Sequence, residues 1–179
     1  AQGVGVTYLN KHVGTFGECG ILSYYGNKTI TCGEGGVVIT DNDDIAKECY
    51  RLKNHGRDKK GSFIHQHIGF NFSFTEMQAA VGIAQMNKLE KIINKKKIIN
   101  SIYLKELKEI YELTPIKIDK NCKPVYWFTS FLTEKNDDLA KYLLEKSIQT
   151  RKFFYPLHLQ PCYLDNDLVY SNECPISSK

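Results

Sequence analysis

The sequence predicts an α/β protein in which short apolar strands are followed by amphipathic helices. Residues 21–25 and 36–40 have the length and the aromatic or branched composition of strands, and glycine-rich turns lie between them. Residues 41–56 and 75–111 instead repeat their apolar residues at helical spacing. Strands joined by such helices favour a mixed or parallel sheet with helical cover.

Three strands are expected before residue 41. Residues 4–9 form the first strand, with a turn at Asn10 and Lys11, and residues 21–25 form the second. Residues 36–40 form the third strand, and their apolar character is typical of a strand that is buried on both faces.

A helix is expected to follow the third strand. Asp41 opens this helix, and Asp43 and Asp44 place negative charge at its positive end. Gly56 is a plausible stop. The polar, glycine-containing residues 57–67 are predicted to form a loop.

A second helical region begins at residue 75 and continues to about residue 111, before Thr114-Pro115. Its first residues, Thr75-Glu76-Met77-Gln78, fit a capping box. One apolar stripe is expected to pack in the core, and it comprises Met77, Ala80, Val81, Ala84 and Leu89. Farther along, a group of lysines is expected to form the solvated face of a helix whose buried side carries Ile92, Ile93, Ile98 and Ile99. These lysines are Lys88, Lys91, Lys95, Lys96 and Lys97.

The pattern changes after residue 115. Residues 125–132, which include the chain's single tryptophan, are predicted to form a strand, and residues 137–147 are predicted to form a helix. Residues 148–154 are a candidate returning strand.

The composition is that of a globular protein, with 42% apolar and 25% charged residues and no apolar run that approaches a membrane span. The net charge of +4 is mild, and the lysine-rich helix lacks the interleaved aromatic residues and arginines of a nucleic-acid-binding surface. Neither a membrane nor a nucleic acid is therefore an expected partner. The six cysteines form no C-x-x-C pair, which favours reduced thiols and a cytoplasmic location.

Lys28 is the residue with the clearest chemical role. It follows the expected strand 21–25 after the turn Gly26-Asn27, and it lies close in sequence to a glycine cluster. An amine held at a strand end is the nucleophile that forms a Schiff base with a carbonyl group. Ser23 and the nearby backbone amides offer the donors that hold a phosphate. The combination predicts pyridoxal phosphate, and the alternative is a surface lysine that happens to follow a strand.

Five short motifs occur in order along the chain: Val13-Gly14-Thr15-Phe16-Gly17; the segment S-Y-Y-G-N-K-T-I-T-C-G-E-G-G from Ser23; Lys53-Asn54-His55-Gly56; Ile68-Gly69-Phe70-Asn71-Phe72 running into Thr75-Glu76-Met77-Gln78-Ala79-Ala80; and Tyr155-Pro156-Leu157-His158-Leu159-Gln160-Pro161. Together they resemble the motifs of the DegT/DnrJ sugar aminotransferases. These are pyridoxal phosphate enzymes of the aspartate aminotransferase type, fold type I. The lysine segment is especially similar to that of perosamine-type synthases.

The resemblance implies roles for individual residues. Lys28 matches the lysine that binds the cofactor covalently and later moves a proton, and Ser23 matches a hydroxyl that donates to the cofactor phosphate. Gln2 matches a residue that contacts the cofactor ring. Asn71 matches an asparagine that reaches the partner subunit's cofactor phosphate, which implies a homodimer with a shared active site. Ser73 stands where many relatives carry arginine, so this loop lacks a charge that they have.

The implied reaction transfers an amino group from glutamate to the keto group of a nucleotide-linked sugar, as in polysaccharide biosynthesis. Perosamine-type synthases act on a GDP-linked 4-keto-6-deoxymannose. Two alternatives stay open: a relative that has lost transamination and catalyses a reaction such as dehydration, and a non-catalytic binding or regulatory domain. The presence of Lys28 argues against the first, because such relatives typically carry histidine there.

The resemblance also predicts an incomplete enzyme that lacks both ends and is inactive by itself. Residues 1–95 match the C-terminal part of the large cofactor-binding domain of the fold. Residues 96–179 match a connecting helix and an incomplete α+β small domain.

Histidines supply only weak candidates. His158 lies between Pro156 and Pro161, in a segment that the family places near the substrate entrance, so a substrate contact and simple loop packing are both open. His65 and His67 have the alternate spacing of half a zinc site, but no third ligand pattern is near them, and no metal is expected.

Overall fold

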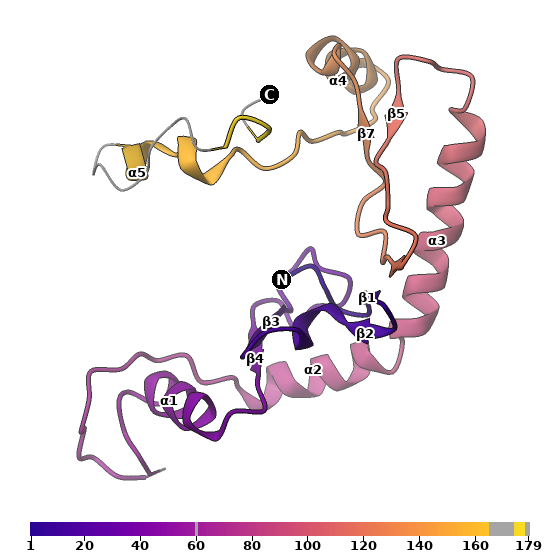
Figure 1. The fold of residues 1–179 in the computed structure, drawn as a ribbon. Coiled ribbons are helices and arrows are strands. Elements are labelled where there is room, and N and C mark those ends of the chain that lie inside the picture. The colour runs from indigo at the N-terminus through magenta and orange to yellow at the C-terminus, as the bar shows by residue number, and fades with distance from the viewer. Residues whose placement is uncertain (60, 165–173, 178–179) are drawn as a thin grey trace. The chain divides into compact units, whose positions relative to one another are not determined.

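The computed structural model describes residues 1–59, 61–164 and 174–177, which fall into two compact units (Figure 1). The first unit comprises Ala1–Leu132 and the second comprises Thr133–Lys179, and each is described by itself. The predicted domain boundary at residues 95 and 96 lies within a helix of the first unit. The division into domains 1–95 and 96–179 stays a prediction about the enzyme.

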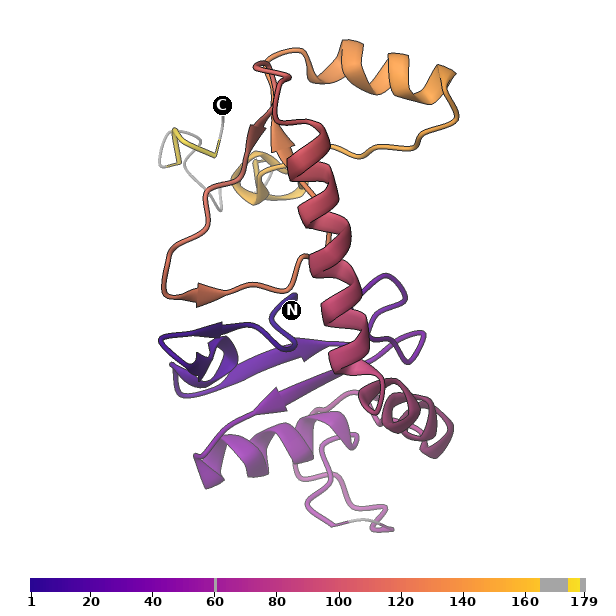
Figure 2. The same cartoon turned by 90° about the vertical axis from the view of Figure 1, so that its right-hand side faces the viewer.

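The first unit contains short strands and three helices. In chain order the elements are β1 (Thr7–Tyr8), β2 (Lys11–His12), the 3-10 helix η1 (Val13–Thr15), β3 (Gly20–Ser23), β4 (Gly36–Ile39), α1 (Asp43–Lys53), α2 (Glu76–Met86), α3 (Leu89–Glu106), β5 (Thr114–Pro115), β6 (Cys122–Lys123) and β7 (Phe131–Leu132). Figure 2 shows α3 running from the end of α2 past the N-terminal strands to β5 and β7. The long predicted helical region thus consists of two helices.

The strands pair in three small sheets, with orders β2-β1-β6, β3-β4 and β5-β7. Every pair among the described residues is antiparallel. The predicted mixed or parallel sheet is therefore wrong for this part of the chain. The reason lies in the connections, because β1 and β2 are joined by a turn at Leu9 and Asn10, and β3 and β4 by a loop, rather than by helices.

The strands predicted at residues 4–9 and 125–132 are much shorter than expected. Residues 4–9 supply only the two residues of β1, because Leu9 and Asn10 have positive φ values of 50° and 61° and already form the turn. Residues 125–132 supply only the two residues of β7. Trp127, which precedes β7, instead contacts Lys28 and Asn27.

The strand β4 is not buried on both faces, as its apolar sequence predicted. Its side chains are exposed over most of its length, and Val38 is 47% exposed. Within the described part of the chain, β4 pairs with a strand on one edge only, namely β3. Its apolar residues therefore have fewer neighbours than those of a central strand.

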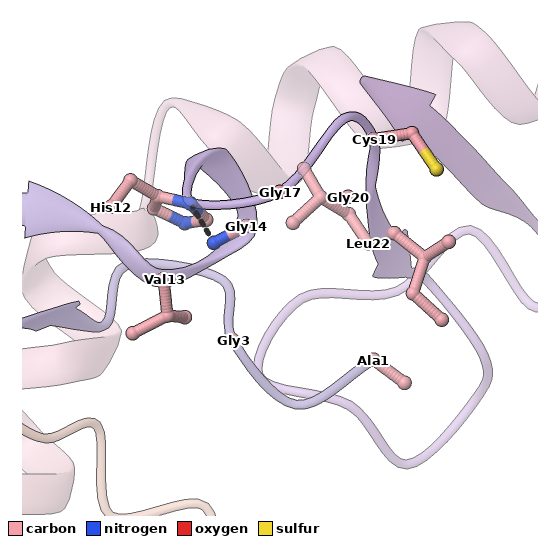
Figure 3. Close-up of a pocket in the computed structure, with 10 residues that line it drawn as sticks. Ala1, Gly3, His12, Val13, Gly14, Gly17, Cys19, Gly20 and Leu22 are labelled. Carbon is pink, nitrogen blue, oxygen red and sulfur yellow. Dashed lines mark hydrogen bonds between the residues drawn. The ribbon is translucent and has the colours of Figure 1, made fainter. Parts of the chain in front are cut away.

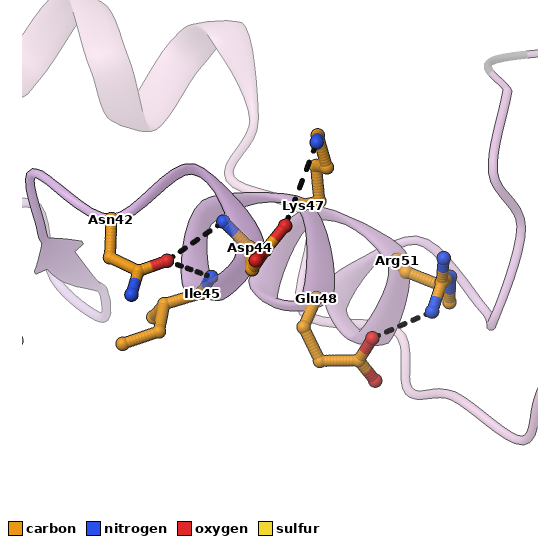
Figure 4. A network of polar contacts seen from close by, with 6 residues as sticks. All are labelled: Asn42, Asp44, Ile45, Lys47, Glu48 and Arg51. Atoms are coloured by element: carbon orange, nitrogen blue, oxygen red, sulfur yellow. Dashed lines mark hydrogen bonds and ion pairs between the residues drawn. The ribbon is translucent and has the colours of Figure 1, made fainter.

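The predicted helix after the third strand is confirmed as α1. Asn42 caps it, and the side-chain oxygen of Asn42 accepts hydrogen bonds from the amides of Asp44 (2.9 Å) and Ile45 (3.2 Å), as Figure 4 shows. On its surface the Arg51 guanidinium pairs with Glu48 at 2.7 Å. A pair this exposed adds little to stability, so the cap and the helix dipole are the main local reasons for the start of α1.

The capping box at the start of α2 is also confirmed. The Thr75 hydroxyl accepts from the amide of Gln78 at 3.2 Å, and the Gln78 side-chain oxygen accepts from the amide of Thr75 at 3.0 Å. The Gln78 side-chain amide also donates to the carbonyl oxygen of Glu34 at 3.0 Å. This last bond fixes which side of α2 faces the loop between β3 and β4.

The buried stripe predicted for α2 is wrong. Met77 is 80% exposed, and Ala80, Val81 and Ala84 are exposed as well, while only Leu89, at the start of α3, is half-buried. The inward side carries small residues instead, and a Cβ atom at Gly82 would lie 2.9 Å from the Cys32 sulfur. The bond from Gln78 to Glu34 turns this side toward the loop and leaves the bulky stripe outside.

Replacing Thr75 with alanine is expected to lower the free energy of unfolding by about 1 kcal/mol, because the amide of Gln78 loses its partner. The variant Thr75→Ser keeps a hydroxyl at the cap and is expected to lose much less. Urea unfolding of both variants measures the difference. Equal losses in the two variants would show that the cap does not contribute.

The core of the first unit forms where α3 meets the N-terminal segment and the residues before β7. Val4, Ile30 and Val125 are buried, and Ile30 is only 1% exposed. A Cβ atom at Gly5 would lie 2.6 Å from the Ile93 side chain, so the chain packs closely against α3 at this point. Farther along α3 the predicted buried side is wrong, because Ile98 and Ile99 are exposed while Ile92 and Ile93 are half-buried.

Where it is described, the second unit contains helices but no strand. It contains α4 (Asn136–Glu145), the 3-10 helix η2 (Leu157–Leu159) and α5 (Pro161–Leu164). The helix predicted at 137–147 is confirmed as α4, whereas residues 148–154 form no strand. In the part of the chain that the structure describes, no helix has the length and apolar character needed to cross a membrane.

Candidate active site

Ser23 is the last residue of β3 and Lys28 follows it in the next turn, and Tyr25 is hydrogen-bonded to both. The amide of Tyr25 donates to the Ser23 hydroxyl oxygen at 3.4 Å, and its carbonyl oxygen accepts from the amide of Lys28 at 3.0 Å. Gly26 and Asn27 form the predicted turn. The lysine and the serine are thereby held by the same few residues.

The loop that continues from Lys28 is folded back onto the end of β3. The Tyr24 carbonyl oxygen accepts from the amide of Cys32 at 2.9 Å and from the Thr31 hydroxyl at 3.1 Å. Thr29 and Ile30 are buried directly after the lysine. Lys28 is therefore anchored on its C-terminal side by core packing, while its own side chain is half-buried.

The ammonium group of Lys28 lies over an aromatic ring. Its nitrogen is 4.4 Å from the ring centroid of Trp127, within the range of a cation–π interaction. The indole N–H of Trp127 donates to the carbonyl oxygen of Asn27, next to the lysine, at 2.5 Å. Among the described residues, no carboxylate forms an ion pair with Lys28.

The sequence did not identify Trp127 as part of this site. Its position among aromatic residues predicted a strand, and 100 positions separate it from Asn27. The one available signal was that it is the only tryptophan in the chain.

Gln2 is exposed at the start of the chain, next to a cavity. Its neighbours Ala1 and Gly3 line this cavity of about 320 Å³, together with residues of η1 and β3, as Figure 3 shows. The cavity wall is partly backbone, and the His12 ring nitrogen Nδ1 accepts from the amide of Gly14 at 3.1 Å. Lys28 does not line it, and a contact of Gln2 with a cofactor ring stays a prediction.

Asn71 lies beside the C-terminal end of α1. Its backbone forms an isolated bridge with Asn54, and the amides of Phe70 and Phe72 donate to the carbonyl oxygens of Leu52 (2.7 Å) and Lys53 (3.1 Å). The Asn71 residue is exposed. None of the contacts described for it joins it to Lys28, so its predicted action on a partner subunit's cofactor remains untested.

His158 belongs to the second unit. It lies in η2 and is only 9% exposed. A residue at a substrate entrance would be expected to be more exposed than this. Its contact with a substrate stays a prediction.

Of the two histidines considered for zinc, His65 has a partner for its ring. Its Nδ1–H donates to the carbonyl oxygen of His55 at 2.6 Å. The described residues contain no group of three or more potential metal ligands.

A second cavity, of about 290 Å³, lies between the loop after β3 and α2. Tyr24, Cys32, Phe74 and Met86 are among the residues that line it. Burial raises the pKa of the Cys32 thiol. Burial also raises the pKa of the Tyr24 hydroxyl, with a smaller contribution from Cys32.

Cys32 is therefore expected to react with iodoacetamide severalfold more slowly at pH 8 than the exposed Cys19. The raised pKa leaves less thiolate at this pH, and the thiolate is the reactive form. Mass spectrometry of the labelled peptides measures both rates in one sample. The difference should vanish in urea, and equal rates in the folded protein would contradict the burial of Cys32.

The whole chain, residues 1–179, matches the DegT/DnrJ/EryC1/StrS aminotransferase family. It belongs to this family. Among its relatives, the GDP-perosamine synthase of Escherichia coli O157:H7 is 37% identical over 166 residues, covering 91% of this chain and 45% of that protein. The GDP-perosamine synthase of Vibrio cholerae is 37% identical over 171 residues, covering 91% of this chain and 46% of that protein.

Solved structures of family members confirm the predicted fold class. The crystal structure of S. venezuelae DesV in complex with a ketimine intermediate matches with a TM-score of 0.87 and 25% identity, covering 99% of this chain and 48% of DesV. The described part of the chain thus has the α/β fold of these aminotransferases. The chain spans about half the length of the curated relatives that it matches.

Family membership indicates pyridoxal phosphate as the cofactor, as predicted. This cofactor needs an amine for its aldehyde and hydrogen-bond donors for its phosphate. Lys28 provides a half-buried amine that is in contact with a ring rather than a carboxylate. The Ser23 hydroxyl accepts one bond from Tyr25 and keeps its own hydrogen for donation. These two residues therefore fit the cofactor in chemical type.

Proposed function

We propose that the complete protein carrying this chain is a pyridoxal phosphate-dependent transaminase. It takes an amino group from glutamate and transfers it to the keto group of a nucleotide-linked hexose. The proposal is supported by family membership and by relatives named GDP-perosamine synthase. The observation that carries it in this chain is a lysine held in a defined turn, with Tyr25 hydrogen-bonded both to its backbone and to the Ser23 hydroxyl.

In this proposal, Lys28 is both the covalent anchor of the cofactor and the group that moves a proton. Its side-chain nitrogen lies on a flexible stem, whereas its backbone is fixed by the Tyr25 carbonyl oxygen and by the buried Thr29 and Ile30. A fixed backbone that carries a mobile side-chain amine suits both tasks. When bound, the cofactor supplies the electron sink that transamination requires.

Ser23, Gln2 and Asn71 complete the proposed site. Ser23 donates its hydroxyl hydrogen to the cofactor phosphate, and Gln2 contacts the cofactor ring. Asn71, in the segment that lies beside the end of α1, reaches the phosphate bound by the partner subunit. The last role makes the protein a homodimer, and we place it in the cytoplasm with its nucleotide-linked substrate.

Isotope transfer tests the reaction. The complete protein is incubated with pyridoxal phosphate, ¹⁵N-glutamate and GDP-linked 4-keto-6-deoxymannose, and the sugar product is analysed by mass spectrometry. The proposal expects 2-oxoglutarate and an aminated sugar that contains ¹⁵N. Consumption of the sugar without ¹⁵N incorporation would indicate a non-transaminating reaction, and no reaction with this and other nucleotide-linked keto sugars would contradict the proposal.

Mixed dimers test the shared site. The variants Lys28→Ala and Asn71→Ala are each expected to be impaired, and co-expression should restore activity because one of the two sites in the mixed dimer has both native residues. Light scattering measures the oligomeric state in parallel. Absence of restoration in a protein that is dimeric would contradict the role of Asn71 across the interface.

A further inference from the structure

We propose that Trp127 is a positioning residue for Lys28. Its ring holds the lysine ammonium group in place, and its indole N–H holds the turn that carries the lysine. This inference rests on the proposed function of Lys28. It adds a residue that no match to the family motifs identifies.

Hydrogen bonds of the backbone and of the side chain fix Trp127. Its amide donates to the carbonyl oxygen of Val125 at 2.7 Å, and its own carbonyl oxygen accepts from the side-chain ammonium of Lys96 at 3.0 Å. Its indole N–H donates to the carbonyl oxygen of Asn27 at 2.5 Å. The residue is thus fixed at both its backbone and its side chain, which gives the ring a defined position beside Lys28.

The residues that hold Trp127 are themselves part of the packed interior. Val125 is buried, and it lies against α3 at the point where Gly5 and Ile93 meet. Lys96 is half-buried on α3, and burial lowers its pKa. This lysine was expected on the solvated face of the helix, and its bond to Trp127 explains why it is not fully solvated there. The ring is therefore connected through α3 to the core.

An aromatic ring holds an ammonium group differently from a carboxylate. It attracts the positive charge over its face, but it has no lone pair that would accept a proton from the lysine. A carboxylate partner would favour the charged form and oppose release of the proton. The ring also attracts the charged form, but it carries no net negative charge, so it holds the ammonium group less strongly than a carboxylate would. The tryptophan can thus orient the lysine while opposing its reaction as a nucleophile less than a carboxylate would.

Other lysine–aromatic contacts in the described residues are longer. The nitrogen-to-centroid distances are 5.1 Å for Lys11 and Phe16, 5.8 Å for Lys53 and Tyr50, and 5.8 Å for Lys146 and Tyr142. In none of the three is the ring a tryptophan, which gives the strongest such interaction. The Lys28 contact also has the second bond, from the same indole to the neighbouring Asn27.

Fluorinated tryptophans at position 127 test the ring contact directly. Successive fluorination withdraws charge from the ring face while it nearly preserves the ring shape. In the complete protein without cofactor, acetylation of Lys28 is followed by peptide mass spectrometry, with Lys11 as an internal standard. Acetylation by a small reagent needs the amine to be released but not oriented, whereas cofactor attachment needs it oriented. Acetylation of Lys28 is therefore expected to increase stepwise as fluorination weakens the ring contact, severalfold over the series, while that of Lys11 stays constant. An unchanged Lys28 rate would overturn the role of the ring.

Substitution tests the effect on cofactor attachment. After incubation with pyridoxal phosphate and borohydride reduction, the mass of the Lys28 peptide reports the attached fraction. Trp127→Leu is expected to slow attachment about tenfold, and Trp127→Phe, which keeps a ring but loses the N–H, about threefold. Phe128→Leu is the matched control, because Phe128 contacts the Trp127 ring at 4.2 Å between centroids but is 56% exposed. It should change the rate by less than about twofold.

The outcomes separate this inference from the proposed function. Wild-type attachment in a folded Trp127→Phe protein, or an equal loss in Phe128→Leu, would overturn the positioning role. If Trp127→Leu does not fold, the fluorination series and Trp127→Phe still test the positioning role of Trp127. The acetylation trend requires no cofactor and no sugar, so it can hold even if the ¹⁵N experiment shows no transamination. Conversely, if ¹⁵N is transferred but the acetylation of Lys28 does not change with fluorination, the proposed function is retained and the positioning role of Trp127 is rejected.

Discussion

Replacement of Lys28 with alanine is expected to abolish covalent attachment of pyridoxal phosphate and to reduce amino transfer by about 10³-fold or more. The variant loses the covalent anchor and the proton-transferring group in one change, and no other lysine of the described residues is held in this turn. Visible absorbance of the purified protein and the mass of its borohydride-reduced peptides measure attachment. The ¹⁵N assay measures transfer.

The matched control is Lys11→Ala. Lys11 also lies over an aromatic ring, that of Phe16 at 5.1 Å, but it is exposed in β2 and far in sequence from the lysine motif. It should retain native attachment and transfer. Undiminished attachment in Lys28→Ala, or modification of a different lysine in the wild-type protein, would remove the basis for the proposed function.

Replacement of Gly56 with alanine is expected to destabilise the protein by about 3 kcal/mol or more. Gly56 has a φ of +75°, and a Cβ atom there would overlap the carbonyl oxygen of His67. A Cβ atom at Gly69 would in turn overlap the Gly56 amide. The two glycines thus allow the end of α1 to lie directly against the segment that contains Asn71. Neither backbone can move aside without breaking two hydrogen bonds: the Phe70 amide donates to the Leu52 carbonyl oxygen, and the Phe70 carbonyl oxygen accepts from the His55 amide.

Gly61→Ala provides the control for this prediction. Gly61 has nearly the same φ, +81°, but nothing lies within 4 Å of a Cβ atom placed there. It should cost only the strain of the left-handed backbone, about 1 kcal/mol. Urea unfolding measures both variants, and hydrogen exchange should show loss of protection at the Phe70 and Phe72 amides in Gly56→Ala alone. Equal effects of the two substitutions would mean that the close approach is not required.

Features set by a few neighbouring residues were predictable from the sequence. The Asn42 cap lies within the predicted start of α1, and the capping box of Thr75 and Gln78 forms as expected. The turn at Gly26-Asn27 is also confirmed. In each case the partners are at most three residues apart, so the sequence contains nearly all of the information needed.

Burial was predicted less well, because it depends on distant contacts. Val38 and Met77 have the apolar pattern of core residues but are exposed. The inward side of α2 was decided by the bond between Gln78 and Glu34, which are 44 positions apart. Lys96 illustrates the opposite error, because its charge predicted solvent contact whereas a backbone carbonyl of Trp127 holds it half-buried.

The candidate site shows the same division. Lys28 and Ser23 are only five positions apart, at the end of β3 and in the turn that follows it, so local pattern and family resemblance both pointed to them. Trp127 lies 100 positions from Asn27 and belongs to no motif, so only the folded structure reveals it. Gln2, Asn71 and His158 are known from the resemblance alone, and their roles stay predictions, of which the mixed-dimer experiment addresses that of Asn71.

The chain's only tryptophan can serve as a fluorescent probe, because it lies beside Lys28. Its indole is within van der Waals range of the lysine proposed to bind a chromophore, so energy transfer from its excited state to that chromophore should be efficient. Fluorescence emission from this residue should therefore fall as the holoenzyme assembles. The protein would thus report its own cofactor loading in real time without an added dye.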